Sequence, residues 1–84
     1  MDEIRKKLEA RTNELRRLVD KGEKDFDHGR LDAFYELTCK RCGLAELEEY
    51  TMSKYQNQAT PTERLKGRKA GYREALGIIF GEAA

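Results

Sequence analysis

Hydrophobic residues near the start of the chain recur at helical spacing. Ile4, Leu8, Leu15 and Leu18 are separated by four, seven and three positions, so they share one narrow side of a helix. A stripe this narrow can bury only one side of the helix. Two alternatives follow: the stripe packs against the rest of this chain, or it pairs with a second copy as a short coiled coil.

The helical phase continues beyond this first stripe. It passes without interruption through Gly22, Phe26, Gly29, Ala33 and Leu37. Because a glycine weakens a helix by only about 1 kcal/mol, the pattern predicts one long helix over residues 2–42, straight or kinked, with Gly43 as its left-handed cap. A break near residues 20–24 is the alternative, since Asp20 followed by Glu23 could cap a new helix.

Two further helices are predicted in the second half of the chain. Regularly spaced hydrophobic residues indicate a short helix over residues 45–55, and a polar connector follows it. Thr60, Pro61 and Glu63 then mark the start of a helix over residues 61–80. Thr60 suits the N-cap, Pro61 suits the first helical position, and Glu63 can close a capping box with the threonine.

The composition agrees with a helical fold. The chain has 84 residues, of which 39% are charged and only one is proline, and this favours solvated helices over a sheet. We therefore expect a single all-α domain over residues 1–84, a small helical bundle or helical hairpin. No apolar run approaches the roughly 18 residues that a membrane span requires, and the amino terminus lacks a signal-peptide core. These features predict a cytoplasmic protein.

An eight-residue motif occurs twice, as GRLDAFYE at residues 29–36 and as GRKAGYRE at residues 67–74. Each copy places two small residues four positions apart, with an aromatic residue next to the second. This spacing lets two helix backbones approach closely, and we expect the two motifs to mark a helix crossing or interface. A chance match and a direct duplication are alternatives, although no similarity is expected outside the motif. The predicted crossing residues are Gly29, Ala33, Phe34, Gly67, Gly71 and Tyr72.

The two cysteines and the single histidine do not form a recognisable reactive site. Cys39 and Cys42 lie near a predicted helix end, whereas a redox pair should open a helix whose dipole lowers the thiol pKa. A zinc site needs two more ligands, and His28 is about 16 Å from Cys39 along a continuous helix. A four-cysteine site shared across a dimer is one alternative, and apolar packing of the thiols is the other. We expect no catalytic residue, no metal and no cofactor.

Basic residues cluster in the last predicted helix. A nucleic-acid interpretation uses them as phosphate contacts. Their projection to both sides of an apolar stripe is instead typical of long side chains that flank a buried surface. The near balance of 17 basic and 16 acidic residues also argues against a surface built mainly for nucleic acid. The residues concerned are Arg64, Lys66, Arg68, Lys69 and Arg73.

The sequence predicts interaction rather than catalysis. The long helix carries apolar residues on two sides, and in a chain with few helices one of its neighbours is expected to be another subunit. The leading hypothesis is therefore a non-enzymatic protein-interaction or accessory module that pairs with itself as a homodimer and with an unidentified protein. Its small size is typical of accessory proteins encoded by phages or mobile elements. The alternative is a nucleic-acid-binding accessory protein that uses the basic C-terminal helix.

Overall fold

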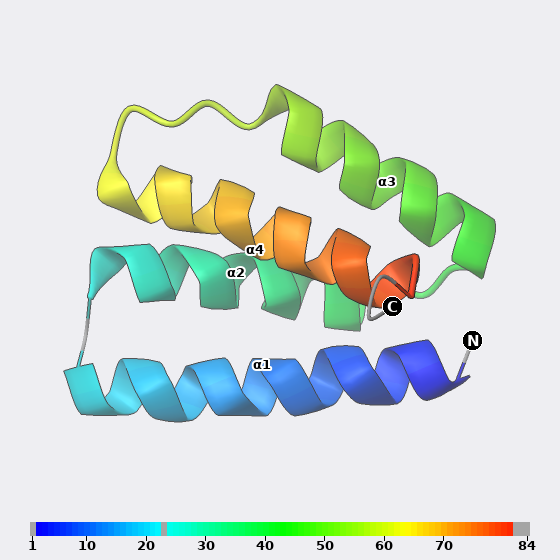
Figure 1. Cartoon of the computed structure of the whole chain (residues 1–84), viewed down its shortest axis with the longest axis horizontal. Helices are drawn as coiled ribbons and strands as arrows, with labels where there is room; N and C mark the ends of the chain where they lie inside the picture. Colours follow the sequence, from blue (N-terminus) through cyan, green and yellow to red (C-terminus); the bar gives the residue numbers. More distant parts are fainter. Residues whose placement is uncertain (1, 23, 82–84) are drawn as a thin grey trace.

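The chain folds into a small bundle of helices (Figure 1). The computed structural model describes residues 2–22 and 24–81, and within them it contains four helices and no strand. The prediction of an all-α helical bundle is confirmed. The helices are α1 (Asp2–Gly22), α2 (Asp25–Cys39), α3 (Leu44–Asn57) and α4 (Glu63–Ile79).

The N-terminal segment forms two helices rather than one. α1 ends at Gly22 and α2 begins at Asp25, so the prediction of one continuous helix over residues 2–42 is wrong and the break near residues 20–24 is present. Lys24 has extended backbone angles, φ −80° and ψ 134°, and caps α2 with no side-chain hydrogen bond. The proposed capping role of Glu23 lies outside the described residues.

This break allows α2 to fold back along α1. The α1 stripe is thereby covered within the chain, because Leu8 and Leu15 have no exposed surface. Burial of each leucine contributes about 1.5–3 kcal/mol, which outweighs the few hydrogen bonds lost at the break. Of the two alternatives for this stripe, packing against the rest of the chain is present, although Leu18 stays 45% exposed.

Two predicted helix ends also differ from the structure. α2 ends at Cys39, and Gly43 has φ −75° and is the N-cap of α3, so its predicted role as a left-handed cap is wrong. α4 begins at Glu63 with Thr62 as its N-cap, two residues later than predicted. The Thr62 hydroxyl accepts a hydrogen bond from the Leu65 amide at 3.2 Å. A threonine cap therefore starts this helix, but Thr60 and Pro61 precede it.

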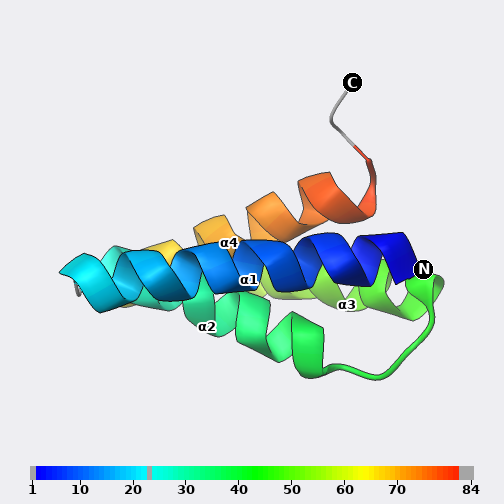
Figure 2. The ribbon, with the colours of Figure 1, turned by 90° about the horizontal axis from the view of Figure 1, so that it is seen from below.

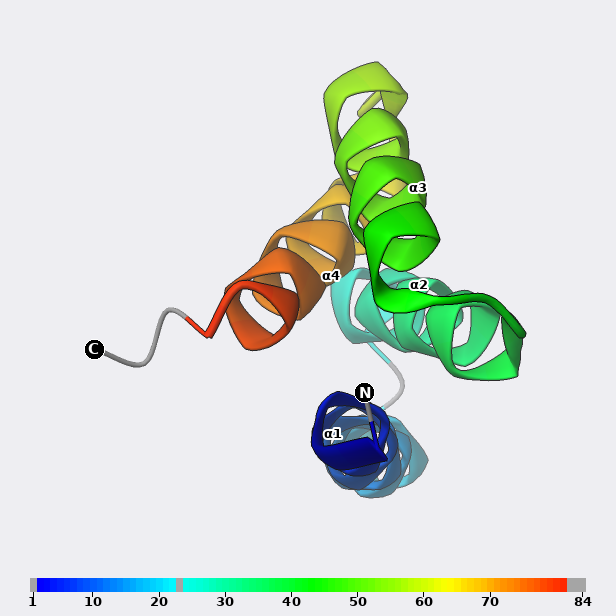
Figure 3. The same cartoon turned by 90° about the vertical axis from the view of Figure 1, so that its right-hand side faces the viewer.

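α2 and α4 form the centre of the bundle and run in the same direction (Figure 1). α1 packs on α2, and α3 packs on α4 on the opposite side, as the view along the bundle shows (Figure 3). α1 spans the 32 Å length of the molecule (Figure 2). No described helix is both long and apolar enough to cross a lipid bilayer. The core between the helices includes Leu8, Leu15, Leu31, Ala33, Phe34, Leu37, Leu47, Tyr72, Ala75 and Ile79.

Candidate functional site

The two copies of the repeated motif meet where α2 contacts α4. A Cβ atom on Gly29 would lie 1.8 Å from the carbonyl oxygen of Arg64, and one on Gly67 would lie 1.8 Å from the carbonyl oxygen of Phe26. Each glycine thus faces the residue three positions before the other glycine. A Cβ atom on Gly71 would lie 2.8 Å from the Cβ of Ala33. The helix backbones are in direct contact, and the contact is reciprocal.

The aromatic and charged residues of the motif take part in the same crossing. Phe34 and Tyr72 are fully buried beside it. Arg30 of the first motif donates to Glu74 of the second. Arg68 of the second motif donates to Glu36 of the first at 3.5 Å. The arginine of each motif therefore pairs with the glutamate of the other, which gives the recurrence a structural basis.

The similarity between the two halves extends beyond the motif. LEART begins at Leu8 in α1 and LEEYT begins at Leu47 in α3. Both leucines are buried, as are Thr12 and Thr51. Each threonine hydroxyl donates to the carbonyl of its leucine at 2.7 Å. The expectation that no similarity lies outside the motif is therefore wrong, and this agreement favours the alternative of a duplicated helical hairpin.

The outer helices also contact the motifs in equivalent ways. Arg11 is the fourth residue of LEART and donates to Glu74 at 3.0 Å. Tyr50 is the fourth residue of LEEYT, and its hydroxyl donates a hydrogen bond to Glu36. The chain consists of two helical hairpins, α1–α2 and α3–α4, which pack together through α2 and α4 (Figure 3).

Glu36 is the centre of a half-buried polar network that joins α2, α3 and α4. Its carboxylate accepts hydrogen bonds from the Tyr50 and Tyr72 hydroxyls and pairs with Lys54 at 3.6 Å and with Arg68 at 3.5 Å. Burial raises the pKa of this carboxyl group, but the two hydroxyl hydrogen bonds and the two cations outweigh burial and hold the pKa below its usual value. Glu36 is therefore ionised at neutral pH and acts as an acceptor.

The two tyrosines of this network have raised pKa values. The hydrogen bond to Glu36 and then burial raise the pKa of Tyr50 to about 12. Burial and then the hydrogen bond to Glu36 raise the pKa of Tyr72 to about 12. Both hydroxyls remain protonated donors at neutral pH, and their hydrogen bonds to Glu36 join α2 to α3 and α4.

This network predicts a loss of stability in alkali. A tyrosine whose pKa is raised in the folded state contributes stability below its unfolded pKa of about 10, and loses it as the pH rises toward the folded value. The free energy of unfolding should therefore fall between about pH 10 and about pH 12. Urea denaturation at a series of pH values measures it. Tyr50→Phe should show a shallower fall, and parallel curves for the two proteins would contradict the assignment.

The five basic residues of α4 divide into two groups. Arg64 forms two hydrogen bonds with the Asp32 carboxylate, at 2.9 and 3.2 Å. Arg68 donates to the Tyr72 hydroxyl at 3.0 Å and to Glu36. These two arginines face α2 and are engaged by the protein itself, so they are poorly placed to contact phosphate.

The other three basic residues line a groove of about 290 Å³ between α3 and α4, together with Tyr55 and Thr60. Lys66 pairs with Glu63 at 3.4 Å, and the Lys69 ammonium lies 5.2 Å from the centre of the Tyr55 ring. Arg73 is exposed at the edge of the same groove. None of the described residues that line this groove is acidic.

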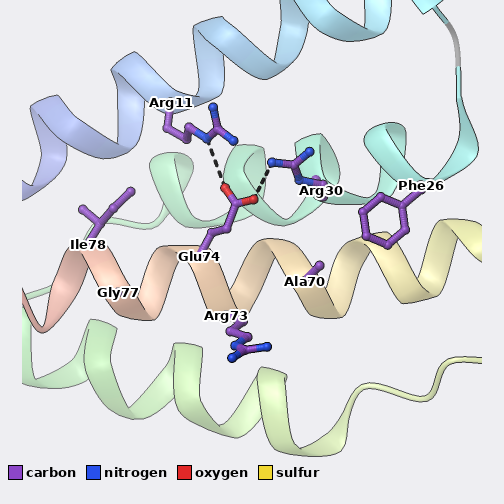
Figure 4. A pocket seen from close by; sticks show the side chains of 8 residues that line it. All are labelled: Arg11, Phe26, Arg30, Ala70, Arg73, Glu74, Gly77 and Ile78. Atoms are coloured by element: carbon purple, nitrogen blue, oxygen red, sulfur yellow. Dashed lines mark hydrogen bonds and ion pairs between the residues drawn. The ribbon is translucent and has the colours of Figure 1, made fainter. Parts of the chain in front are cut away.

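A second groove, of about 670 Å³, lies between α1 and α4, with α2 contributing to its lining (Figure 4). The Glu74 carboxylate points into it and lies between Arg11 and Arg30, while Arg73 points to the other side of α4, toward α3 (Figure 4). Apolar or small residues form the remainder of its lining. They are Phe26, Ala70, Gly77 and Ile78.

The two halves of the molecule differ at this groove. Phe26 and Ala70 line it, and their equivalents in the other half, 38 positions away, are Arg64 and Asp32. Arg64 and Asp32 form an ion pair across the outside of the crossing. On the α1–α4 side these two positions are occupied by Phe26, whose ring is 37% exposed, and by the small side chain of Ala70. This side is therefore the more apolar surface of the α2–α4 crossing.

A third groove, of about 350 Å³, lies where α3 meets the end of α4. Glu48 and Glu49 supply its charge, and Met52 and Phe80 supply its apolar surface. Phe80 is 53% exposed, which makes it the most exposed of the large hydrophobic residues described. None of the described residues that line this groove is basic.

The cysteines lie at the end of α2 and in the loop that follows. Cys42 is half-buried and packs against the core, as expected for an apolar thiol, whereas Cys39 is exposed, so the expectation of apolar packing is wrong for Cys39. The Arg5 guanidinium donates to the carbonyls of Lys40 at 2.6 Å and of Cys42 at 3.3 Å, and so fixes this loop. His28 is half-buried in the first turn of α2. Across residues 2–22 and 24–81, no three potential metal ligands lie together.

Comparisons with protein-family models, with curated proteins and with solved structures found no match for this chain.

Proposed function

We propose that this chain is a non-enzymatic protein-interaction module that forms a homodimer. The observation that supports this is the outward side of α4, where three grooves expose apolar surface next to charged residues. Exposed apolar surface rimmed by polar residues is typical of interaction sites. α2 has α1 on one side and α4 on the other, so the two-sided helix noted in the sequence is covered within the chain. The surface offered to a partner surrounds α4 and includes the adjoining side of α3.

The molar mass of the protein in solution tests the homodimer proposal. Static light scattering on a dilution series should give twice the chain mass of 9.7 kDa at tens of micromolar, and a lower mass on dilution. The reason is that association would cover the apolar surface around α4. A mass of one chain at every concentration up to about 1 mM would contradict the homodimer.

Nucleic-acid binding is the second candidate. The observation that favours it is the groove lined by Lys66, Lys69 and Arg73, because cations beside the half-buried Tyr55 ring suit a phosphate backbone. This candidate is weakened by Arg64 and Arg68, whose guanidinium groups are bound to carboxylates of α2.

A cytoplasmic location and an origin in a phage or mobile element, both expected from the sequence, remain parts of the proposal of a homodimeric interaction module.

A further inference from the structure

We propose that the second copy of this chain docks on the outward face of α4, with the two α4 helices antiparallel across a two-fold axis. This inference rests on the homodimer proposed above and adds its interface. The α4 face has two ends. The basic end consists of Lys66, Lys69 and Arg73, and the acidic end consists of Glu48 and Glu49 of the neighbouring α3 together with Phe80.

The two ends carry opposite charge. α3 and α4 run in opposite directions, and the first turns of α3 lie beside the end of α4 (Figure 1). The groove along the first half of α4 has three cations and no acidic residue among its described lining. The groove near the end of α4 has two carboxylates and no basic residue among its described lining. The α4 face is therefore complementary to itself when it is reversed.

The symmetry of a dimer decides how the ends meet. In a two-fold dimer the same patch is used by both copies, so each contact occurs twice. An axis that crosses α4 at right angles places the basic end of each copy opposite the acidic end of the other. An axis parallel to α4 would place like ends together, which electrostatic repulsion disfavours. The charge pattern therefore selects the antiparallel arrangement.

The part of the face between the two ends can supply apolar contact. Ala70 and Gly77 are seven positions apart and so lie on the same side of α4, where their small size lets a second helix come close. Phe26 borders this part of the face, and Phe80 lies beside Met52 at the acidic end. An apolar centre with charged residues at its edges is the usual anatomy of a protein interface, and exposed aromatic residues are its common anchors.

Charge reversal at either end tests this interface. Lys66→Glu with Lys69→Glu makes both ends acidic, and Glu48→Lys with Glu49→Lys makes both ends basic. Each double variant alone should raise the dimer dissociation constant by about 100-fold or more, because like charges then face each other twice. An equimolar mixture of the two should regain a dimer near wild-type affinity, because opposite charges again meet at both ends. Sedimentation equilibrium measures the masses.

A matched control separates this effect from net charge. Arg16→Glu with Arg17→Glu changes the charge of the exposed side of α1 by the same amount as the lysine variant. This control should leave the dimer dissociation constant unchanged. Far-ultraviolet circular dichroism of every variant should show wild-type helix content, since the substituted side chains lie at the surface.

The outcomes separate the interface from the homodimer itself. A wild-type dimer that both double variants retain unchanged, or a mixture that stays monomeric, overturns the α4 interface and leaves the homodimer standing. A monomeric wild type overturns both. A monomeric wild type could instead bind a DNA or RNA duplex in low salt, with binding lost in the Lys66→Glu, Lys69→Glu variant. This outcome overturns the homodimer and the α4 interface in favour of the nucleic-acid function.

Discussion

Replacing Gly67 with alanine is expected to lower the free energy of unfolding by about 3 kcal/mol or more. The added Cβ would lie 1.8 Å from the carbonyl oxygen of Phe26, a backbone atom of α2 that cannot rotate away. The two central helices must separate to admit the methyl group, and the reciprocal contact at Gly29 would open with them. Since the free energy of unfolding of a small domain is about 5–15 kcal/mol, urea denaturation followed by circular dichroism should detect this loss clearly.

Two other glycines make this test specific. A Cβ on Gly22 meets no atom within 4 Å, so Gly22→Ala should leave stability unchanged or raise it by up to about 1 kcal/mol. Gly71→Ala should fall between the two, because the added Cβ would lie 2.8 Å from the Ala33 methyl and 2.9 Å from the Arg30 carbonyl oxygen, both farther than the 1.8 Å contact at Gly67. If Gly67→Ala were no less stable than Gly22→Ala, the backbones would not be in contact at the motif.

The sequence located the centre of the fold better than its edges. Small residues four positions apart and an adjacent aromatic residue were enough to predict where α2 and α4 meet, because few other side chains allow backbones to touch. The break after Gly22 was harder to predict. Local propensity changes by only about 1 kcal/mol at a glycine, and the break is decided by the packing of α1 on α2.

The candidate surfaces were mostly hidden from sequence reasoning, although one signal was present. Both motifs carry an arginine and a glutamate at the same positions. Where two such helices cross, the arginine of each motif can pair with the glutamate of the other, as the structure has it. The hairpin repeat was obscured because α1 and α3 match at an offset of 39 positions while the motifs match at 38. The groove between α1 and α4 depends on how far α1 lies from α4, and no local pattern reports that distance.

Removing the Glu36 carboxylate is expected to cost about 2–4 kcal/mol. In Glu36→Ala the buried Tyr72 hydroxyl still accepts from Arg68 but has no acceptor for its own proton. Tyr50 and Lys54 lose their partner as well, so α3 loses its polar link to α2. Chemical denaturation at pH 7 measures the loss, and a cost below about 1 kcal/mol would show that the network does not hold the helices together.

The equivalent glutamate of the other motif provides the matched control. Glu74 joins two arginines, but its side chain is 33% exposed against 24% for Glu36, and neither partner is a buried hydroxyl. Glu74→Ala should therefore cost only about 1 kcal/mol.

The pH dependence of stability tests the ionisation of Glu36. The pKa of Glu36 is lowered in the folded protein, so its contribution is present above the usual value of 4.5 and is lost as the pH falls through the lowered value. The difference in stability between wild type and Glu36→Gln should accordingly shrink as the pH falls below 4.5, and a difference that stays constant into acid would exclude an ionised Glu36 as its source.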